Sequence, residues 1–154
     1  MRILKSLFVV FSMLFALSAS AWADQITNYV KDGVAIAGAD PVAYFTQNAS
    51  VIGKPEFSVD WNGVSWRFAS AANRDAFAAN PQKFAPQFGG FCATGTAFGK
   101  KVPIDPTRFT VVNGKLYLNN SAGAQSVFNG DIQGTIAKAN ANWAKIEAVP
   151  ANKL

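Results

Sequence analysis

The sequence predicts a small single domain of the α+β class, built on two antiparallel β-hairpins and several short helices. Two alternating segments, 56–68 and 109–118, each carry an Asn-Gly pair near the centre, and Asn-Gly is the strongest short-range signal for a two-residue hairpin turn. Helical patterns lie between and after these hairpins. Because single strands and helices do not alternate, this order excludes a βαβ nucleotide-binding fold.

The turn of each hairpin dictates its register. A two-residue turn pairs the residues on either side of it, and successive pairs point to opposite faces of the hairpin. Around Asn62-Gly63, the pairs expected on the core face are Trp61–Val64, Val59–Trp66 and Phe57–Phe68, and those expected in water are Asp60–Ser65 and Ser58–Arg67. Around Asn113-Gly114, the expected core pairs are Val111–Leu116 and Phe109–Leu118.

Helix-start signals precede several of the remaining apolar segments. Asp40 before Pro41 is typical of an N-cap followed by a first-turn proline, and Ser70 is expected to cap the next helix. The expected helices are, in order, 41–45, 71–79 ending near Asn80-Pro81, a short turn at 81–85, 121–128, and 132–146, whose apolar residues recur at helical spacing.

The N-terminal 23 residues have the pattern of a secretory signal peptide. A basic start and an apolar run precede Ala21 and Ala23, the small positions that a signal peptidase requires. The apolar run is shorter than the ~20 residues of a membrane-spanning helix. We therefore expect a periplasmic or secreted product without membrane attachment, with a domain at 24–147 and a flexible tail at 148–154.

The composition restricts the possible functions. The chain carries 14 basic and 9 acidic residues but no basic stripe interleaved with aromatic residues, so nucleic-acid binding is not expected. It has one cysteine, Cys92, and no histidine, which excludes an internal disulfide and leaves no imidazole to act as a base. Met1 and Met13 both lie in the predicted signal peptide, so Cys92 is the one soft metal ligand expected in the exported chain.

Several segments together resemble the YHS-domain family. They are "DPVAYF" (40–45), the first Asn-Gly hairpin, "WRFASAANRDAFAANPQKFAP" (66–86) and "GGFCA" (89–93). The chain is most similar to the small exported YHS-domain proteins of bacteria, over about 33–143. The resemblance implies a treble-clef-like unit of hairpin and helix, with a metal site in cysteine-bearing members for which copper is the expected metal.

The chain departs from the metal-type members at the positions where the resemblance implies thiolates. Those positions hold Ala43, Ala69 and Asn73. Copper(I) and structural zinc need thiolate, thioether or imidazole ligands, typically two to four of them. We therefore expect the treble-clef-like unit without its metal, and no cofactor. A copper ion shared between two copies of the chain through Cys92 is the alternative.

Cys92 admits several roles. Free cysteines are among the most buried residue types, which favours a packed structural thiol. Thiol chemistry with another protein and a redox or enzymatic role are the alternatives. The candidate ligand-contacting residues are Tyr44, Gly89, Gly90, Phe91 and Cys92, although core aromatics and a glycine-dependent chain reversal would explain the first four more simply.

Taken together, these patterns predict an exported, non-enzymatic binding or accessory module for an unknown small molecule or protein. We expect a monomer, with a dimer as the alternative. The other function classes that stay open are a periplasmic copper- or metal-handling protein and a thiol-dependent redox or enzyme subunit, both through Cys92.

Overall fold

The computed structural model describes residues 26–154, and the predicted signal peptide (1–23) lies outside the described residues. Two sheets and a set of short helices form one α+β domain, as the sequence predicts. The first sheet has the strand order β1 (Val30–Lys31), β2 (Val34–Ala35), β4 (Val64–Phe68), β3 (Lys54–Trp61). The second sheet consists of β5 (Asp105–Val112) and β6 (Lys115–Asn119).

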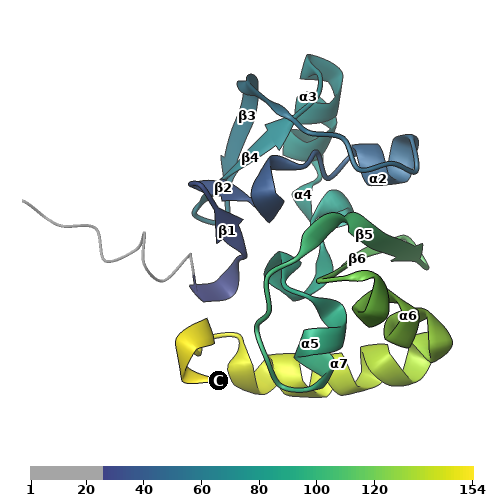
Figure 1. Ribbon diagram of the computed structural model, residues 1–154. Coiled ribbons are helices and arrows are strands. Elements are labelled where there is room, and N and C mark those ends of the chain that lie inside the picture. Colours follow the sequence, from purple (N-terminus) through teal and green to yellow (C-terminus); the bar gives the residue numbers. More distant parts are fainter. Residues whose placement is uncertain (1–25) are drawn as a thin grey trace, which may run out of the picture.

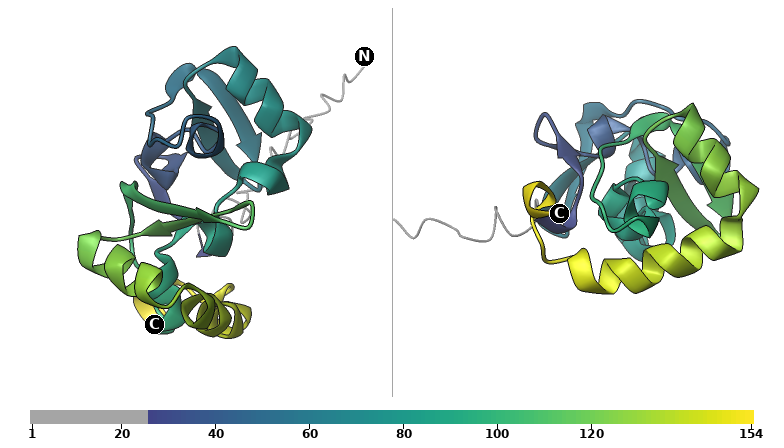
Figure 2. Two further views of the ribbon diagram at one scale, coloured as in Figure 1. Left: turned by 90° about the vertical axis from the view of Figure 1, so that its right-hand side faces the viewer. Right: turned by 60° about the horizontal axis from the view of Figure 1, so that its bottom comes forward.

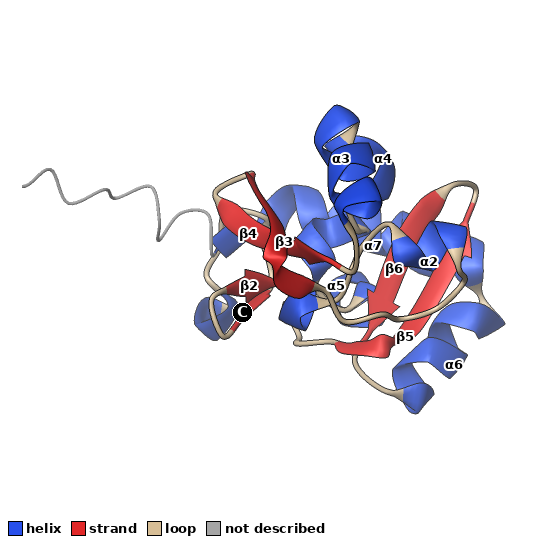
Figure 3. Cartoon of the chain, turned by 90° about the horizontal axis from the view of Figure 1, so that it is seen from above, coloured by secondary structure: helices blue, strands red, loops and turns tan. Residues whose placement is uncertain are grey.

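Helices cover both sheets. The α-helices are α2 (Ala43–Thr46), α3 (Ala71–Ala79), α4 (Pro81–Phe84), α5 (Ala93–Ala97), α6 (Ala122–Gly130) and α7 (Ile132–Ile146), and the 3₁₀ helices are η1 (Ile36–Gly38), η2 (Gln87–Gly90) and η3 (Ala151–Lys153). Figure 1 shows the first sheet with α3 in the upper part of the molecule and the second sheet with α5, α6 and α7 in the lower part. Viewed from above, the two sheets lie side by side (Figure 3).

Both predicted hairpins form around their Asn-Gly turns. Asn62 and Asn113 have φ of 52° and 51°, as a type I′ turn requires of its first central residue. The expected pairs of β5 with β6 are confirmed. In the first hairpin Val59–Trp66 and Trp61–Val64 are confirmed, as are both pairs on the water face.

One predicted pair of the first hairpin is wrong. Phe68 pairs with Lys54 instead of Phe57, because a bulge shifts the register between Lys54 and Ser58. Pro55 lies inside this bulge and has no N–H group to donate to the ladder. Phe57 is nevertheless half-buried against the core, so the expected alternation of faces holds along β3.

A third, very short hairpin was not predicted. β1 and β2 pair across Asp32-Gly33, whose φ values of 53° and 77° are those of a type I′ turn. Strand β2 then joins the first sheet through one parallel pair, Val34 with Ser65. The first sheet is therefore mixed, whereas the sequence suggested antiparallel pairing throughout.

The predicted helices are confirmed with small shifts. α3, α4 and α7 lie where they were expected, and the Ser70 side chain accepts a hydrogen bond from the Asn73 amide as a helix cap. α2 begins at Ala43 because Pro41 and Val42 form a turn instead of its first residues. The tail that was expected to be flexible contains η3.

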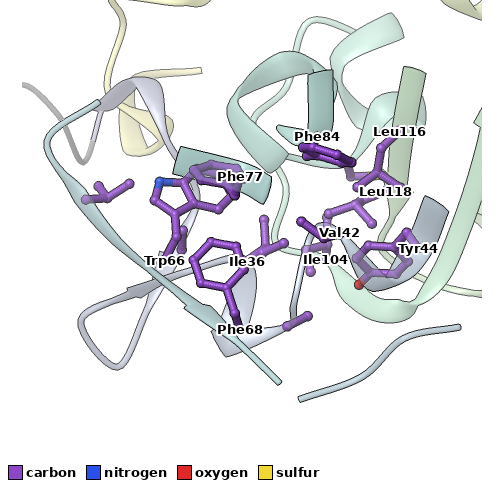
Figure 4. Packing of buried hydrophobic residues seen from close by; sticks show 14 residues of the cluster. Ile36, Val42, Tyr44, Trp66, Phe68, Phe77, Phe84, Ile104, Leu116 and Leu118 are labelled. Carbon is purple, nitrogen blue, oxygen red and sulfur yellow. The ribbon is translucent and has the colours of Figure 1, made fainter. Parts of the chain in front are cut away.

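The main core lies between the two sheets. Trp66, Phe68 and Phe77 pack together from the first sheet and α3, with ring centroids 5.1–5.3 Å from that of Phe77. Figure 4 shows Ile36 and Val42 between this aromatic group and the second-sheet residues Leu116 and Leu118. A second cluster, centred on Phe88, Tyr117, Phe128 and Ala139, fastens α7 to the domain.

Candidate functional site

Two clefts lie beside the first described segment of the chain, residues 26–33, which we call the N-terminal segment. The first cleft has a volume of about 430 Å³ and is lined by residues of β1, its turn, and the segment after α5. Its lining includes Tyr29, Asp32, Phe91, Lys101 and Ala151. The second cleft, about 120 Å³, is lined by Trp61, Trp66, Gly89, Trp143 and Glu147 among others. Small-molecule sites typically have volumes of ~300–1,000 Å³, so the first cleft has the size for an organic ligand and the second falls short of it.

The first cleft combines aromatic rings with one exposed carboxylate. The rings of Tyr29 and Phe91 meet edge to face, with centroids 5.8 Å apart. Burial and the nearby carboxylate of Asp32 raise the pKa of Tyr29, while a backbone hydrogen bond at Ile104 opposes them. The phenol is therefore neutral at physiological pH, and the Asp32 carboxylate, on an exposed turn residue, is the charged group that a ligand can reach.

Lys101 lines the first cleft, and its ammonium group already has three hydrogen-bond acceptors. Its Nζ donates to the main-chain oxygens of Ile26, Glu147 and Val149 at 2.7, 2.6 and 2.8 Å. The same nitrogen lies 5.4 Å from the ring centroid of Phe91 and 5.2 Å from that of Trp143. We call these three oxygens and two rings the Lys101 cage. Burial lowers the pKa of Lys101, and the Glu147 carboxylate opposes that shift.

Tyr44 and Gly90, two of the residues predicted to contact a ligand, belong to the packed interior. Tyr44 is 1% exposed, donates from Oη to the Pro106 carbonyl at 2.7 Å, and packs on Phe109. Gly90 is buried, and a Cβ there would lie 2.6 Å from Ile36 Cγ2. Neither lines a cleft described above.

Gly89 and Phe91 do reach the clefts, but different ones. Gly89 lines the second cleft and Phe91 the first. A Cβ on Gly89 would meet the carbonyl oxygen of Thr27, and the Gly89 carbonyl accepts a hydrogen bond from the Tyr29 amide at 2.8 Å. Gly89 therefore serves the close approach of two backbones.

Cys92 is a packed thiol, with 1% of the residue exposed. Its surroundings are more polar than the sequence suggested. The amides of Gly95 and Asn120 each donate to Sγ at 3.3 Å, and Sγ lies 3.7 Å from Oδ1 of the buried Asn119. Cys92 therefore caps α5 with its sulfur. This arrangement uses the thiol as a hydrogen-bonding group of the fold.

Asp40 is a fully buried carboxylate at the junction of three elements. Oδ1 accepts from the amides of Val42 and Ala43 at 2.8 and 3.3 Å. Asp40 was predicted to be the N-cap of a helix that begins at Pro41, and this is wrong in detail, because α2 begins at Ala43 with Val42 as its N-cap and the Asp40 carboxylate holds the turn before it. Oδ2 accepts from the Ala69 amide at 2.8 Å and from Asn73 Nδ2 at 2.7 Å. We call these four donors the Asp40 network. It brings together Ala43, Ala69 and Asn73, the positions at which the resemblance implied thiolates.

Comparison with family models, with curated proteins and with solved structures gave no match for this chain. Within residues 26–154, no three His, Cys, Asp or Glu side chains come close enough to hold a metal ion. No helix in the same range has both the length and the apolar character needed to cross a membrane.

The sequence patterns did not single out Tyr29, Asp32 or Lys101. A signal for the first two was present, because Asp32-Gly33 is itself a hairpin-turn pair and places Tyr29 at the edge of β1. Lys101 offered no such signal. It follows Lys100, which is exposed, and nothing local distinguishes the buried lysine from its neighbour.

Proposed function

We propose that this protein is an exported, non-enzymatic binding or accessory module of the YHS-domain type, with the first cleft as its ligand site. The volume of the first cleft supports this assignment. It is about 430 Å³, and small-molecule sites typically have volumes of ~300–1,000 Å³. Sites of that kind have mainly apolar walls with few polar groups, as Tyr29, Phe91 and Asp32 provide.

The Asp40 network supports the family proposal. Ala43, Ala69 and Asn73 come from α2, the end of β4 and α3, and each contacts the same carboxylate. Positions assigned to one metal site by a resemblance should be neighbours in space, and these three are. In this chain a carboxylate and its donors occupy the junction, which supports a treble-clef-like unit held by hydrogen bonds.

The first cleft favours a particular ligand chemistry. The three N–H groups of the Lys101 ammonium already have acceptors, so they are not available to an anionic ligand. The exposed Asp32 carboxylate can accept hydrogen bonds, and the aromatic rings can pack on an apolar body. We therefore propose a small molecule with an apolar part and a hydrogen-bond donor or positively charged end.

An NMR screen of small amines and neutral compounds with apolar bodies would test the site. Binding should shift the amide signals of Tyr29, Asp32 and Gly33, and Asp32→Asn should weaken it. Asp60→Asn is the matched control, because Asp60 is exposed on the outer face of β3. Shifts confined to other surfaces, or equal affinities for both variants, would contradict the assignment of the first cleft. Native mass spectrometry of protein from an exporting cell would report any ligand carried from the cell and the oligomeric state.

The copper alternative gains no support from Cys92. A copper ion shared between two copies would need Sγ at the surface, whereas the residue is 1% exposed and Sγ accepts two backbone hydrogen bonds. Competition with a copper(I) chelator should detect no submicromolar site, and Cys92→Ser should not change that result. A tight site that disappears in Cys92→Ser would establish the metal-handling function instead.

A further inference from the structure

The Lys101 cage gathers groups from three distant parts of the chain. Ile26 is the first described residue, Glu147 and Val149 follow α7, and Lys101 lies between α5 and β5. The N-terminal segment and the C-terminal turn lie side by side in the views of Figures 1 and 2. One ammonium group thus connects both ends of the described chain to the middle of the domain.

The cage matches the chemistry of a primary ammonium ion. Such an ion has three N–H donors on one nitrogen and no acceptor, and the cage supplies three carbonyl oxygens at 2.6–2.8 Å. The faces of aromatic rings attract a cation within about 6 Å of the ring centroid, and the rings of Phe91 and Trp143 both meet this condition. Lys101 is 6% exposed, so this set of groups replaces the water that the ammonium loses.

Each fastened segment also has hydrogen bonds of its own. The Tyr29 amide donates to the Gly89 carbonyl, the Tyr29 carbonyl accepts from the Ile36 amide at 3.1 Å, and Asn28 Nδ2 donates to the Asn62 carbonyl at 3.2 Å. At the other end, the Val149 amide donates to the Ile146 carbonyl within the turn that ends α7. These bonds hold one end each, whereas the Lys101 ammonium is bonded to both.

We infer that Lys101 fills a built-in site for a primary ammonium ion and thereby fastens the two ends of the domain, so that the segments around Ile26 and Val149 open and close together. Tyr29, Lys101 and Ala151 all line the first cleft, so the same fastening sets the walls of that cleft.

Amide hydrogen exchange on the purified protein tests this coupling. In Lys101→Met, exchange at the Tyr29 and Val149 amides should both accelerate by about tenfold or more, since hydrogen bonds to a charged group are stronger than neutral ones. Amides of the β3–β4 hairpin should keep their rates. Lys100→Met is the matched control, because Lys100 is an adjacent exposed lysine. Acceleration at one end only, or equal acceleration in both variants, would overturn the inference.

Chemical rescue separates recognition of an ammonium from simple packing. In Lys101→Ala, propylammonium chloride should slow exchange again at both reporter amides, because it restores the missing methylenes and the three N–H donors. Tetramethylammonium chloride at the same concentration has a charge but no N–H donor, and should not. Equal effects of the two salts would contradict a site for a primary ammonium.

Loss of protection in the β3–β4 hairpin of these variants would also contradict the inference, because the ends would then unfold only with the core. Lys101→Arg should weaken the contacts of the cage less than Lys101→Met does. The guanidinium keeps the charge but spreads its donors over a planar fork, so both reporter amides should accelerate together and less than in Lys101→Met. Acceleration of one amide without the other in Lys101→Arg would again count against the coupling.

Discussion

Asp40 and Lys101 are two buried charges that the domain stabilises in opposite ways. Asp40 is 0% exposed and accepts from three backbone amides and one side-chain amide, whereas Lys101 is 6% exposed and donates to three backbone carbonyls. The ion pairs among the described residues, Arg74–Asp75 and Arg108–Asp105, lie elsewhere. At both residues, hydrogen bonds to peptide groups stabilise the buried charge in place of an oppositely charged side chain.

The difference between the two lies in where their partners come from. Asp40 takes half of its donors from the next turn of chain and the rest from the β4–α3 junction in the centre of the domain. The partners of Lys101 are the two ends of the described chain. The Asp40 network therefore ties together elements that the core also holds, while the Lys101 cage joins the two ends of the described chain to each other. The predictions below test this contrast.

The largest effect on stability is expected from the loss of a buried apolar side chain, that of Trp66. Trp66 is 1% exposed and packs on Phe77 and Trp61. Trp66→Ala should lower the free energy of unfolding by about 3–5 kcal/mol, as large-to-small aromatic changes in cores do. Ser65→Ala, on the opposite face of β4, should change it by less than ~0.5 kcal/mol. Urea unfolding measures both, and equal midpoint shifts would refute the assignment of faces.

Asp40→Ala should have the next largest effect and lower the free energy of unfolding by about 3 kcal/mol. The substitution removes one acceptor group and leaves the amides of Val42 and Ala69 and the side chain of Asn73 without it, and unpaired buried donors are costly. Asp60→Ala, at an exposed position, is the control and should be close to neutral. A loss below ~1 kcal/mol in Asp40→Ala would show that water replaces the carboxylate and that the network is not central.

Ionisation of Tyr44 tests the cost of a buried charge that has fewer polar partners than Asp40 or Lys101. The pKa of Tyr44 is raised from 10.0 to about 12, mainly by burial and to a smaller extent by the charges of Asp105 and Asp40, while a hydrogen bond with Ser50 opposes the shift. Between these pH values the unfolded chain loses the phenolic proton while the folded protein keeps it. Stability is therefore complete below pH 10 and falls by about 2–3 kcal/mol as pH rises through 12.

The comparison with Tyr44→Phe isolates this effect. The other groups that titrate in the same range, such as Tyr29, Tyr117 and Lys101, are present in both proteins, so their contributions cancel in the difference. The stability difference between wild type and Tyr44→Phe, followed by urea unfolding from pH 9 to pH 12, should shift in favour of the variant. A difference that does not change with pH would mean that the Tyr44 phenol ionises without penalty.

Lys101→Met should lower the free energy of unfolding by about 2 kcal/mol, less than Asp40→Ala. Methionine keeps most of the packing in the cage but leaves three carbonyls without a donor. Because the ends can open to let water reach those oxygens, the cost is reduced. Thermal unfolding beside Lys100→Met would measure it. A larger loss than that of Asp40→Ala would reverse the contrast drawn above.

The smallest expected effect is that of Cys92. Cys92→Ala should cost about 1 kcal/mol, the usual scale for a small buried group, since Sγ accepts two backbone hydrogen bonds in addition to its packing. Native protein should react slowly with a thiol reagent at neutral pH and quickly in denaturant. Fast labelling of the folded protein, or a disulfide-linked dimer on a non-reducing gel, would restore a working role for this thiol.

The sequence allowed the elements of this fold to be predicted where the determining interactions are local. Asn62-Gly63, Asn113-Gly114 and Ser70 each act through residues a few positions away, and each lies in the predicted turn or cap. The Phe57–Phe68 pair failed because Pro55 interrupts the ladder, which alternation alone does not reveal.

The candidate site was less predictable because its residues meet only in three dimensions. The first cleft joins Tyr29 and Asp32 from the N-terminal hairpin with Lys101 and Ala151 from distant segments. Of the predicted contacts, Phe91 alone lines it. A buried lysine held by main-chain carbonyls leaves no mark on its local sequence, since every residue offers a carbonyl.

The bulge in β3 has a consequence for how this molecule meets its own copies. β3 is an outer strand of the first sheet, and a regular outer strand is a template on which a neighbouring chain can extend the ladder. Here the exposed residues Lys54, Pro55 and Glu56 occupy the irregular stretch. A charge of each sign, a missing amide hydrogen and a broken repeat all disfavour intermolecular strand pairing, so the distortion that shifted the predicted register also makes this edge a poor template for a second copy.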